Sequence, residues 1–289
     1  MAHVARLYLP SVNKHLVKLP YDKNLAFGID ITRADNPEQF HHICNVLRLQ
    51  IDDNFISFNG TENLDFGFVV TDISKKSLRA KLCFVNDKTL KSQTSQGLNT
   101  KLTLLLCLLK KEQLSDAIRM ATEVGADKII FVTSQNSKQN VKFFNYNRAM
   151  DVVVAAACQC QISKLPILIN KPISIECLLL DDKNINTHLP FNIICANEAL
   201  SDLNTQGSDA GKDFMLDTLK TYINKAANDG RNEIGILIGP EGGFGKDDIL
   251  AISQSTKNIL QLSLGNNILR ASTASTSLLF LLKFLLQNT

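Results

Sequence analysis

Five apolar runs that alternate with helical segments over residues 101–289 constrain the fold of this chain most strongly. The runs are "KLTLLLCLL", "KIIFVT", "FNIICA", "IGILIG" and "ILQLS". Apolar runs without polar alternation are typical of strands that are buried on both faces, as in parallel sheets covered by their connecting helices. The order therefore predicts an α/β fold with a parallel sheet between helices.

The segments between these runs have helical periodicity. "KEQLSDAIRMATEVG" places Leu114, Ile118 and Ala121 on one face and predicts a helix that ends at Gly125. The last segment, "STSLLFLLKFLLQ", is apolar almost all round, which predicts burial on several sides or packing against a second subunit. We expect the other helices over residues 145–161, within 213–228, from Lys246 and, for the last segment, from Ser272.

The N-terminal part predicts a small module that is rich in strands. "SLRAKLCF" places Leu78, Ala80, Leu82 and Phe84 at alternate positions, which is strand periodicity. "DNFISFNG" and "LDFGFVVTDIS" are further short runs with strand propensity, bounded by Asn, Gly and Asp. Short strands of this kind favour a compact barrel.

One helix is expected before these strands, and a linker after them. "EQFHHICNVLRL" has helical spacing at Phe40, Ile43, Val46 and Leu47. Residues 86–100, "NDKTLKSQTSQGLNT", have few apolar side chains and resemble a linker. The predicted domains are therefore residues 1–85, a β-barrel, and residues 101–289, the α/β domain.

Composition limits the partners and the compartment. The formal net charge is only +3, so nucleic acid would have to bind through local basic patches. No signal peptide and no apolar stretch long enough for a bilayer are evident. The seven cysteines include no CxxC pair, so we expect reduced thiols, a cytoplasmic protein and no metal site.

A glycine-rich stretch, "LIGPEGGFGKDD", follows the apolar run at residues 237–248. It fails as a phosphate-binding P-loop because Pro240 stands where the first glycine belongs and Asp247 stands where a hydroxyl belongs. The glycine spacing also fails the dinucleotide fingerprint. The simplest alternative is a tight strand-to-helix turn with acidic residues in the first helical turn, where the helix dipole favours them.

A second glycine-bearing turn, "LSLGNNILRASTA", follows the next apolar run at residues 262–274. In open α/β sheets, ligands bind beyond the carboxyl ends of the strands. Two such loops would form a pocket with backbone N–H and C=O groups on its walls. That pocket suits a ligand read by main-chain hydrogen bonds, such as an adenine edge, better than a phosphate chain.

These two loops, in this order, resemble the bacterial 16S rRNA uridine-N3 methyltransferases, which belong to the SPOUT class and carry an N-terminal PUA-like domain. The resemblance extends over nearly the whole chain. In the N-terminal part it includes "ARLYLP", "HHICNVLRL" followed by "FNG", and "KKSLRAKL". In the C-terminal part it includes "LLKKEQLSDAIRMATEVGADKIIFVTS" and "AAACQCQISKLP".

The resemblance implies a C-terminal domain with a deep trefoil knot, a PUA-like barrel that binds RNA, and a homodimer. It implies an enzyme that uses S-adenosylmethionine to methylate N3 of a specific uridine in the 16S rRNA of the small ribosomal subunit. The implied cofactor contacts are Asn197, Glu198, Ile238, Gly239, Pro240, Glu241, Gly242, Gly243, Leu262, Leu264, Gly265, Ile268 and Leu269.

The proposed chemistry places a cation beside the target base. Negative charge that develops on O2 and O4 as N3 loses its proton would be stabilised by a nearby cation, and Arg270 is the candidate. Arg270 could instead hold a substrate phosphate, or pair with an acidic residue at a helix start. Glu241 and Glu198 could accept a proton or contact the cofactor ammonium, although Glu241 could also only cap amides in its own loop. Because N3 lies on the Watson–Crick edge, the target uridine must be unpaired or flipped out.

The densest basic cluster of the N-terminal module is a candidate RNA contact. It could equally be a strand edge kept soluble by lysines. The candidate residues are Arg48, Lys75, Lys76, Arg79 and Lys81.

Several positions depart from the family pattern. The family commonly has charged residues where Asn267 and Ser272 stand, its E-Q-x-G-R helix motif is replaced at residues 158–162, and its S-E-R motif is replaced at residues 134–136. The residues that stand there in this chain are Cys158, Gln159, Cys160, Gln161, Ile162, Ser134, Gln135 and Asn136. If the replaced glutamates and arginines were salt-bridge partners of one another, their joint loss would leave activity intact, and we favour this interpretation. The alternative is a non-catalytic rRNA-binding or ribosome-assembly protein on a degenerate SPOUT scaffold.

Overall fold

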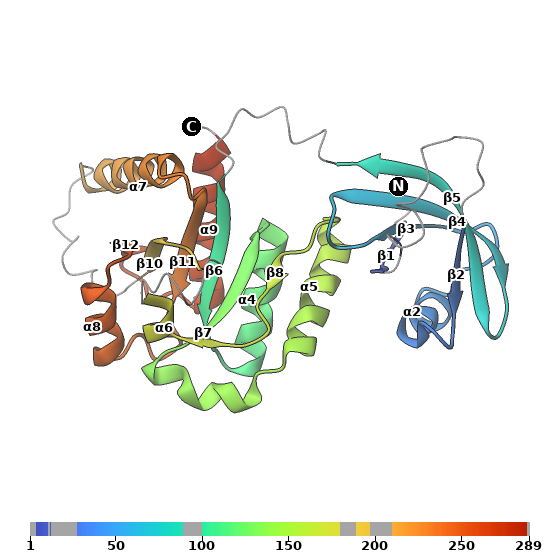
Figure 1. Cartoon of the computed structure of the whole chain (residues 1–289), viewed down its shortest axis with the longest axis horizontal. Helices are drawn as coiled ribbons and strands as arrows, with labels where there is room; N and C mark the ends of the chain where they lie inside the picture. Colours follow the sequence, from blue (N-terminus) through green and yellow to red (C-terminus); the bar gives the residue numbers. More distant parts are fainter. Residues whose placement is uncertain are drawn as a thin grey trace. The chain divides into compact units, whose positions relative to one another are not determined.

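The computed structural model describes residues 4–10, 12, 28–88, 100–179, 189–196 and 210–287 (Figure 1). The chain forms two compact units. The first comprises Met1–Ser95 and Ala157–Leu165, and the second comprises Gln96–Ala156 and Pro166–Thr289. The last strand of the first unit reaches Asp87, two residues into the predicted linker, and most of that linker lies outside the described residues. The domain boundary stays a prediction.

The first unit contains a five-stranded sheet with the order β1-β3-β4-β5-β2. β1 pairs with β3 in parallel, and the other neighbours are antiparallel. Inward-facing side chains from alternate positions, among them Phe55, Phe68 and Leu78, build its core. The strands are β1 (Ala5–Tyr8), β2 (Gly28–Thr32), β3 (Asn54–Phe58), β4 (Leu64–Ile73) and β5 (Ser77–Asp87).

A bulge in β5 corrects one prediction about its inward face. Leu82 pairs with Phe68 while Phe84 pairs with Gly67, so Cys83 is an extra residue in β5. An extra residue reverses the alternation of the side chains that follow it. Phe84 is consequently 51% exposed instead of buried.

The predicted helix near residue 40 is shorter and less regular than its apolar spacing indicates. α2 (Pro37–His41) passes directly into η1 (His42–Val46), a π-helical turn. Phe40 and Ile43 are buried as expected, but Val46 is 58% exposed. The wider π turn rotates Val46 away from the core, because a period of 3.6 residues no longer holds there.

The second unit confirms the predicted α/β fold with a parallel sheet. The sheet order is β12-β10-β11-β6-β7-β8, with β9 also paired to β7, and every pairing is parallel. The strands that align with the five predicted runs are β6, β7, β10, β11 and β12. Their bounds, with those of the short strands β8 and β9, are β6 Lys101–Cys107, β7 Lys128–Thr133, β8 Ile167–Leu168, β9 Ile173–Ser174, β10 Asn192–Ala196, β11 Glu233–Ile238 and β12 Asn258–Leu262.

Helices cover both faces of this sheet, which explains why its strands lack polar alternation. Leu105 and Cys107 point to the face that packs against α6 and α8, whereas Leu104 and Leu106 are equally buried on the opposite face. The helical elements are α4 (Lys111–Val124), η2 (Gln135–Phe143, a 3-10 helix), α5 (Tyr146–Cys160), α6 (Ile175–Leu179), α7 (Ala210–Asn228), α8 (Lys246–Gln254) and α9 (Ala271–Gln287).

α9 packs along α4 and against β11 and β6. It also closes the end of α4: Lys283 Nζ donates to the carbonyl oxygens of Val124 (3.0 Å) and Gly125 (3.4 Å). Gly125 has a φ of +89° at the C-cap, so the predicted end of this helix is confirmed. None of the helices in the described part of the chain combines the length and the apolar character needed to cross a membrane.

Candidate functional site

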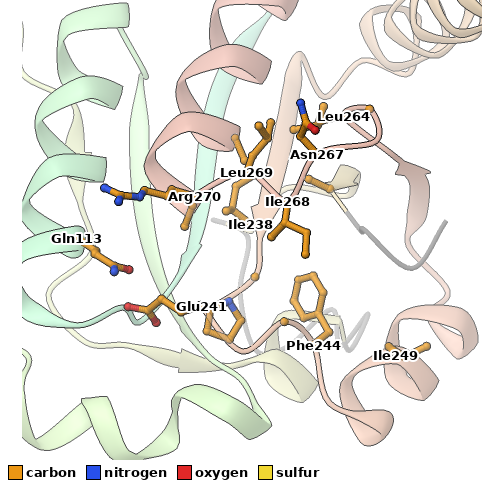
Figure 2. A pocket seen from close by; sticks show the side chains of 17 residues that line it. Gln113, Ile238, Glu241, Phe244, Ile249, Leu264, Asn267, Ile268, Leu269 and Arg270 are labelled. Carbon is orange, nitrogen blue, oxygen red and sulfur yellow. The ribbon is translucent and has the colours of Figure 1, made fainter. Parts of the chain in front are cut away.

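The loops after β11 and β12 lie at the same edge of the parallel sheet and enclose a pocket with a volume of about 390 Å³ (Figure 2). This volume is within the usual range for small-molecule sites. Apolar side chains from both loops form much of its wall, and Figure 2 shows Phe244 and Ile268 facing each other. The lining residues are Gln113, Ala196, Ile238, Gly239, Pro240, Glu241, Gly243, Phe244, Ile249, Leu264, Gly265, Asn267, Ile268, Leu269, Arg270, Ala271 and Ala274.

A buried carboxylate fixes the loop between β11 and α8. Asp248 is only 1% exposed. Its oxygens accept hydrogen bonds from Gly245 N (2.8 Å) and from Gln135 N (3.1 Å to each oxygen). The acidic residue that the sequence placed in the first turn of α8 therefore ties that turn to the segment after β7.

Asn136 makes a second connection between these segments. Its Nδ2 donates to the carbonyl oxygens of Gly242 (3.0 Å) and Gly243 (3.1 Å). Gly243 N also donates to Pro240 O (2.9 Å), which closes a turn inside the loop. Backbone groups and the neutral side chain of Asn136 thus hold the loop in one conformation. The family that the sequence resembles has an arginine at this position.

Two glycines leave backbone open to the pocket. Gly243 and Gly265 have φ values of +68° and +114°, a region that disfavours side chains. A Cβ atom at either residue would meet no other atom within 4 Å, so protein packing does not fill the space beside them. Gly245 differs, since a Cβ there would lie 1.8 Å from Gln135 Oε1. The pocket therefore leaves room for a ligand beside the backbone at Gly243 and Gly265, whose carbonyl oxygens already accept hydrogen bonds from Asn136 and Ser263.

Arg270, Gln113 and Glu241 form the polar side of the pocket, and Figure 2 shows them on the side that faces α4. Glu241 Oε1 accepts a hydrogen bond from Lys110 N (2.9 Å) at the start of α4. Glu241 therefore caps an amide, although of another segment and not of its own loop. Arg270 has no hydrogen bond or ion pair with any side chain among the described residues, so the predicted pairing with an acidic residue is not found there.

The structure gathers most of the residues predicted to contact the cofactor around this one pocket. Gly242 and Leu262 are not among its lining residues: the Gly242 carbonyl is turned toward Asn136, and Leu262 is buried at the end of β12. Asn197 and Glu198 lie outside the described residues. The predicted residues that line the pocket are Ile238, Gly239, Pro240, Glu241, Gly243, Leu264, Gly265, Ile268, Leu269 and Arg270.

Sequence reasoning missed several lining residues. Phe244 directly follows the glycine-rich motif, and Asn267 was noted only as a departure from the family. Gln113 lies in the first turn of α4, and nothing in its local sequence indicates a position beside Arg270. The missed lining residues are Gln113, Ala196, Phe244, Ile249, Asn267, Ala271 and Ala274.

Neither buried cysteine of the sheet is a nucleophile. Burial raises the pKa of the Cys107 thiol to about 12; Ser134 opposes this shift through a hydrogen bond, and the charge of Asp248 adds to it. Burial also raises the pKa of Cys195 far above its usual range. Both thiols therefore stay protonated at neutral pH. Among the described residues, no group of three or more His, Cys, Asp or Glu side chains could hold a metal ion.

The candidate RNA contacts of the first unit are exposed but not equally free. Lys75 and Lys76 lie in the turn between β4 and β5, and Lys81 projects from β5. Arg79 Nε lies 3.2 Å from Asp30 Oδ2, so part of the cluster's charge is compensated. Arg48 comes from the segment after η1 and has a φ of +53°.

Comparisons with known proteins match both parts of the chain. A family model described as an RNA methyltransferase domain matches residues 96–283, and one described as an RNA methyltransferase PUA domain matches residues 35–83. Ribosomal RNA small subunit methyltransferase E of Rickettsia conorii is 31% identical over 236 residues, which is 81% of this chain and 82% of that protein. The protein of the same description from Buchnera aphidicola is 25% identical over 242 residues, or 82% of each chain.

Two solved structures share the fold over nearly the whole chain. A ribosomal RNA small subunit methyltransferase E of Neisseria gonorrhoeae, bound to S-adenosyl methionine, has a TM-score of 0.67 at 17% identity and covers 98% of each chain. A methyltransferase of Legionella pneumophila in complex with the cofactor SAM has a TM-score of 0.66 at 20% identity and covers 97% of each chain. At these identities the likeness concerns the fold alone.

Proposed function

We propose that this chain, which belongs to the RNA methyltransferase family, transfers a methyl group from S-adenosylmethionine to N3 of a uridine in small-subunit ribosomal RNA. Family membership follows from the family model that matches residues 96–283 and from the Rickettsia conorii relative, which is 31% identical over most of both chains. The observation that carries the reaction is the pocket between the loops after β11 and β12, with Arg270 on its wall, whose side chain has no partner in the described part of the chain.

The residues of the pocket fit this cofactor. Apolar side chains such as Ile238, Leu264 and Leu269 offer a wall for the adenine ring. The space beside Gly243 and Gly265 leaves room for its polar edge, and the carbonyl oxygen of each glycine can accept a second hydrogen bond from it. When bound, S-adenosylmethionine supplies an activated methyl group on a sulfonium, so the protein needs no further electrophile.

The chain's own residues would activate and orient the uridine. Arg270 stabilises the charge that develops on O2 and O4 as N3 loses its proton. Glu241 is the only carboxylate among the described lining residues, and its Oε2 atom accepts no hydrogen bond from them, so this oxygen takes the N3 proton. The N3–CH₃ bond forms as the S–CH₃ bond breaks, which leaves S-adenosylhomocysteine and N3-methyluridine.

Gln113 is suited to orient the base. Its carboxamide has both a donor and an acceptor, lines the pocket from α4, and has no side-chain hydrogen bond to the described residues. Gln113 and Arg270 can each donate to a ring carbonyl. Uracil has two such oxygens, whereas cytosine has an amino group in place of O4. Because the guanidinium of Arg270 can only donate hydrogen bonds, it would face a second donor at that position of cytosine and so disfavours cytosine. We assign Gln113 a positioning role.

Two experiments test this function. In calorimetric titration we expect S-adenosylmethionine to bind the purified protein with a dissociation constant in the micromolar range. This constant corresponds to a binding free energy on the order of −8 kcal/mol. Mass mapping of modified uridines should reveal one that loses a methyl group in cells that lack the gene and regains it when the gene is restored. Absence of cofactor binding together with an unchanged map would instead support the non-catalytic rRNA-binding alternative.

We propose that the first unit holds the RNA. Exposed Lys75, Lys76 and Lys81 offer phosphate contacts around one hairpin, and the match of residues 35–83 to a PUA domain supports this role. Arg48 would add a further contact, while Arg79 contributes less because Asp30 pairs with it.

We also propose that the C-terminal chain forms a trefoil knot, as the family resemblance implies. β11 inserts between β10 and β6, and α9 returns to pack on α4, β11 and β6. This arrangement is compatible with the C-terminal segment passing through a loop of the same domain. A chain trace through residues 180–188 and 197–209, which lie outside the described residues, would test it.

A homodimer is the expected assembly. Phe280 and Phe284 lie one turn apart on the apolar helix α9 and are 63% and 54% exposed. We expect sedimentation velocity to give the mass of two chains, and Phe280→Glu to give the mass of one, because a charge would be buried without a partner. An exposed control, Leu250→Glu on α8, should remain dimeric. A wild-type protein that sediments as a monomer at all concentrations would refute the homodimer.

A further inference from the structure

η2, the segment that follows β7, carries an exposed aromatic ring that nothing in the proposed reaction uses. Phe143 is 68% exposed and Val141 is 44% exposed. The next residue, Phe144, behaves in the opposite way: its ring packs against Phe131 with centroids 4.6 Å apart. Phe144 thus anchors the end of η2 in the core, and this anchor holds Phe143 at the surface.

Cationic side chains lie beside this ring and along the same helix. Lys142 Nζ lies 5.0 Å from the centroid of the Phe143 ring. Lys111 and Arg148 line a small depression together with Phe143, and Lys138 lies on the same 3-10 helix. None of these four cations forms an ion pair within the described part of the chain, although Glu176 lies close enough to Lys138 to feel its charge. We call Phe143, Lys111, Lys138, Lys142 and Arg148 the Phe143 surface.

The Phe143 surface is connected to the candidate active site through short, rigid links. Asn136, at the start of η2, donates to the carbonyl oxygens of Gly242 and Gly243 in the pocket loop. Asn140, near its end, donates from Nδ2 to Leu108 O (2.9 Å), two residues before Lys110, whose amide Glu241 binds. The surface and the pocket therefore lie at the same carboxyl edge of the sheet and are held in a fixed relation.

We infer that Phe143 is a stacking platform for a base of single-stranded RNA that flanks the target uridine, and that the surrounding cations contact the neighbouring phosphates. This inference rests on the proposed function. An exposed aromatic ring beside lysines and an arginine is the chemistry that binds unpaired nucleotides, because every base has a face that can stack. A uridine whose Watson–Crick edge is free lies in unpaired or opened RNA, so its neighbours are available for stacking.

The test compares variants of the full-length protein by their affinity for a fluorescein-labelled single-stranded RNA of about 15 nucleotides with a central uridine. Phe143→Ala should weaken binding by about 10-fold, the effect of losing one stacked base. Phe143→Trp should stay close to wild type because it keeps an aromatic face. The control Leu250→Ala, which removes an exposed apolar side chain on α8, should leave the affinity unchanged.

The cations have a separate readout. Lys142→Gln should weaken binding at low salt and reduce the slope of log affinity against log salt by somewhat less than one, on the order of 0.7 for a single strand. S-adenosylmethionine affinity should be the same in all these variants, which shows that the pocket is intact. RNA affinity that is unchanged in Phe143→Ala, with methyl transfer also intact, would overturn the platform and leave the proposed function standing.

Two further outcomes would overturn the inference in different ways. A wild-type protein that binds no RNA and transfers no methyl group would remove the proposed function itself. A change in sedimentation of Phe143→Ala without RNA would show that this surface lies between two copies of the chain instead of against RNA.

Discussion

Arg270 occupies a position that helix stability alone does not favour. It directly precedes α9, and its carbonyl oxygen accepts the amide of Ala274 in the first turn. A helix N-terminus carries partial positive charge, so a cation there costs about 0.3–1 kcal/mol. No acidic side chain among the described residues compensates this charge. A role in binding or catalysis explains why an arginine stands at the pocket wall.

Replacement of Arg270 should therefore affect the methyl transfer step. We expect Arg270→Gln to lower the single-turnover rate by about 100-fold, as for loss of one group that stabilises a developing oxyanion. Arg270→Lys should recover part of this loss, since it keeps the charge but not the planar fork. Cofactor affinity, measured by calorimetry, should change little. A normal rate in Arg270→Gln would exclude the assigned role.

Gln161 also occupies a position that local backbone preference does not favour. It follows α5 with a φ of +62°, where the resembling family has glycine. Left-handed backbone costs a non-glycine residue about 1–2 kcal/mol, partly offset by the greater freedom of glycine in the unfolded chain. We expect Gln161→Gly to raise the free energy of unfolding by about 0.5–1 kcal/mol in urea titration.

Gly230→Ala is the matched control for this prediction. Gly230 has a φ of +77° and no atom within 4 Å of a built Cβ, so only backbone strain is tested. This change should lower the free energy of unfolding by about 1 kcal/mol. Equal stability of wild type and Gly230→Ala would show that strain of the left-handed backbone does not control the free energy of unfolding at such positions.

At the scale of elements, the site depends on one loop that three segments hold. The loop between β11 and α8 is bound by Asp248 from its own helix, by Asn136 from η2 and, through Glu241, to the start of α4. These hydrogen bonds fix the peptide groups before a ligand arrives. Preorganisation of this kind reduces the free energy that binding must spend on ordering the loop.

Neighbouring glycines of this loop should respond differently to substitution. We expect Gly243→Val to weaken S-adenosylmethionine binding at least about 10-fold, because a β-branched residue is strained at φ +68° and its side chain would enter the pocket. Gly242→Ala should bind within about threefold of wild type, since its Cβ would make ordinary contact with Asn136 at 3.5 Å. Equal losses in calorimetry would show that the pocket loop rearranges on binding.

At the scale of the whole molecule, a buried ionic network joins segments that are distant in sequence. Arg6 of β1 donates to both oxygens of Asp65 on β4, each at 2.9 Å, and also to Ile162 O (3.2 Å) and Ser163 Oγ (3.4 Å) after α5. Lys88 Nζ lies 2.7 Å from the same carboxylate. The Arg6 and Asp65 side chains are only 6% and 5% exposed, so loss of one partner leaves a buried charge.

This network predicts a specific sensitivity to acid. Burial alone raises the pKa of Asp65, but hydrogen bonds from Arg6, Lys88 and Ser163 outweigh it and hold the pKa below its ordinary value. A carboxyl with a lowered folded-state pKa contributes stability above its unfolded pKa of about 4 and loses that contribution as the pH falls through the folded value.

Thermal unfolding between pH 7 and pH 2 measures this contribution. At pH 7, Asp65→Asn should unfold more easily by about 3 kcal/mol, because Arg6 and Lys88 lose their counter-charge. The difference between variant and wild type should narrow below about pH 4, where the Asp65 carboxyl of the unfolded chain begins to be protonated, and should be lost once the pH falls through the lower pKa of the folded state. A constant difference over the whole range would show that the charge of Asp65 is not what stabilises the fold.

The predictions from sequence succeeded where the signal is local. Buried strands, the end of α4 at Gly125 and the positions of two loops at the carboxyl edge follow from apolar runs, glycine and chain order. They failed where a local irregularity intervened. The extra Cys83 in β5 and the π turn at η1 moved Phe84 and Val46 out of the core, and neither is visible in an apolar period.

The sequence by itself determined a parallel sheet and the two loops that bear the pocket, because side-chain periodicity and backbone preference act over a few neighbouring residues. Only the tertiary structure decided which side chains meet there. Strand order brings the segments after β6, β7, β11 and β12 to one edge of the sheet, so that Glu241 and Gly242 meet Lys110 and Asn136, which lie more than 100 residues earlier in the chain. Such contacts depend on the register of whole strands, which no local pattern specifies.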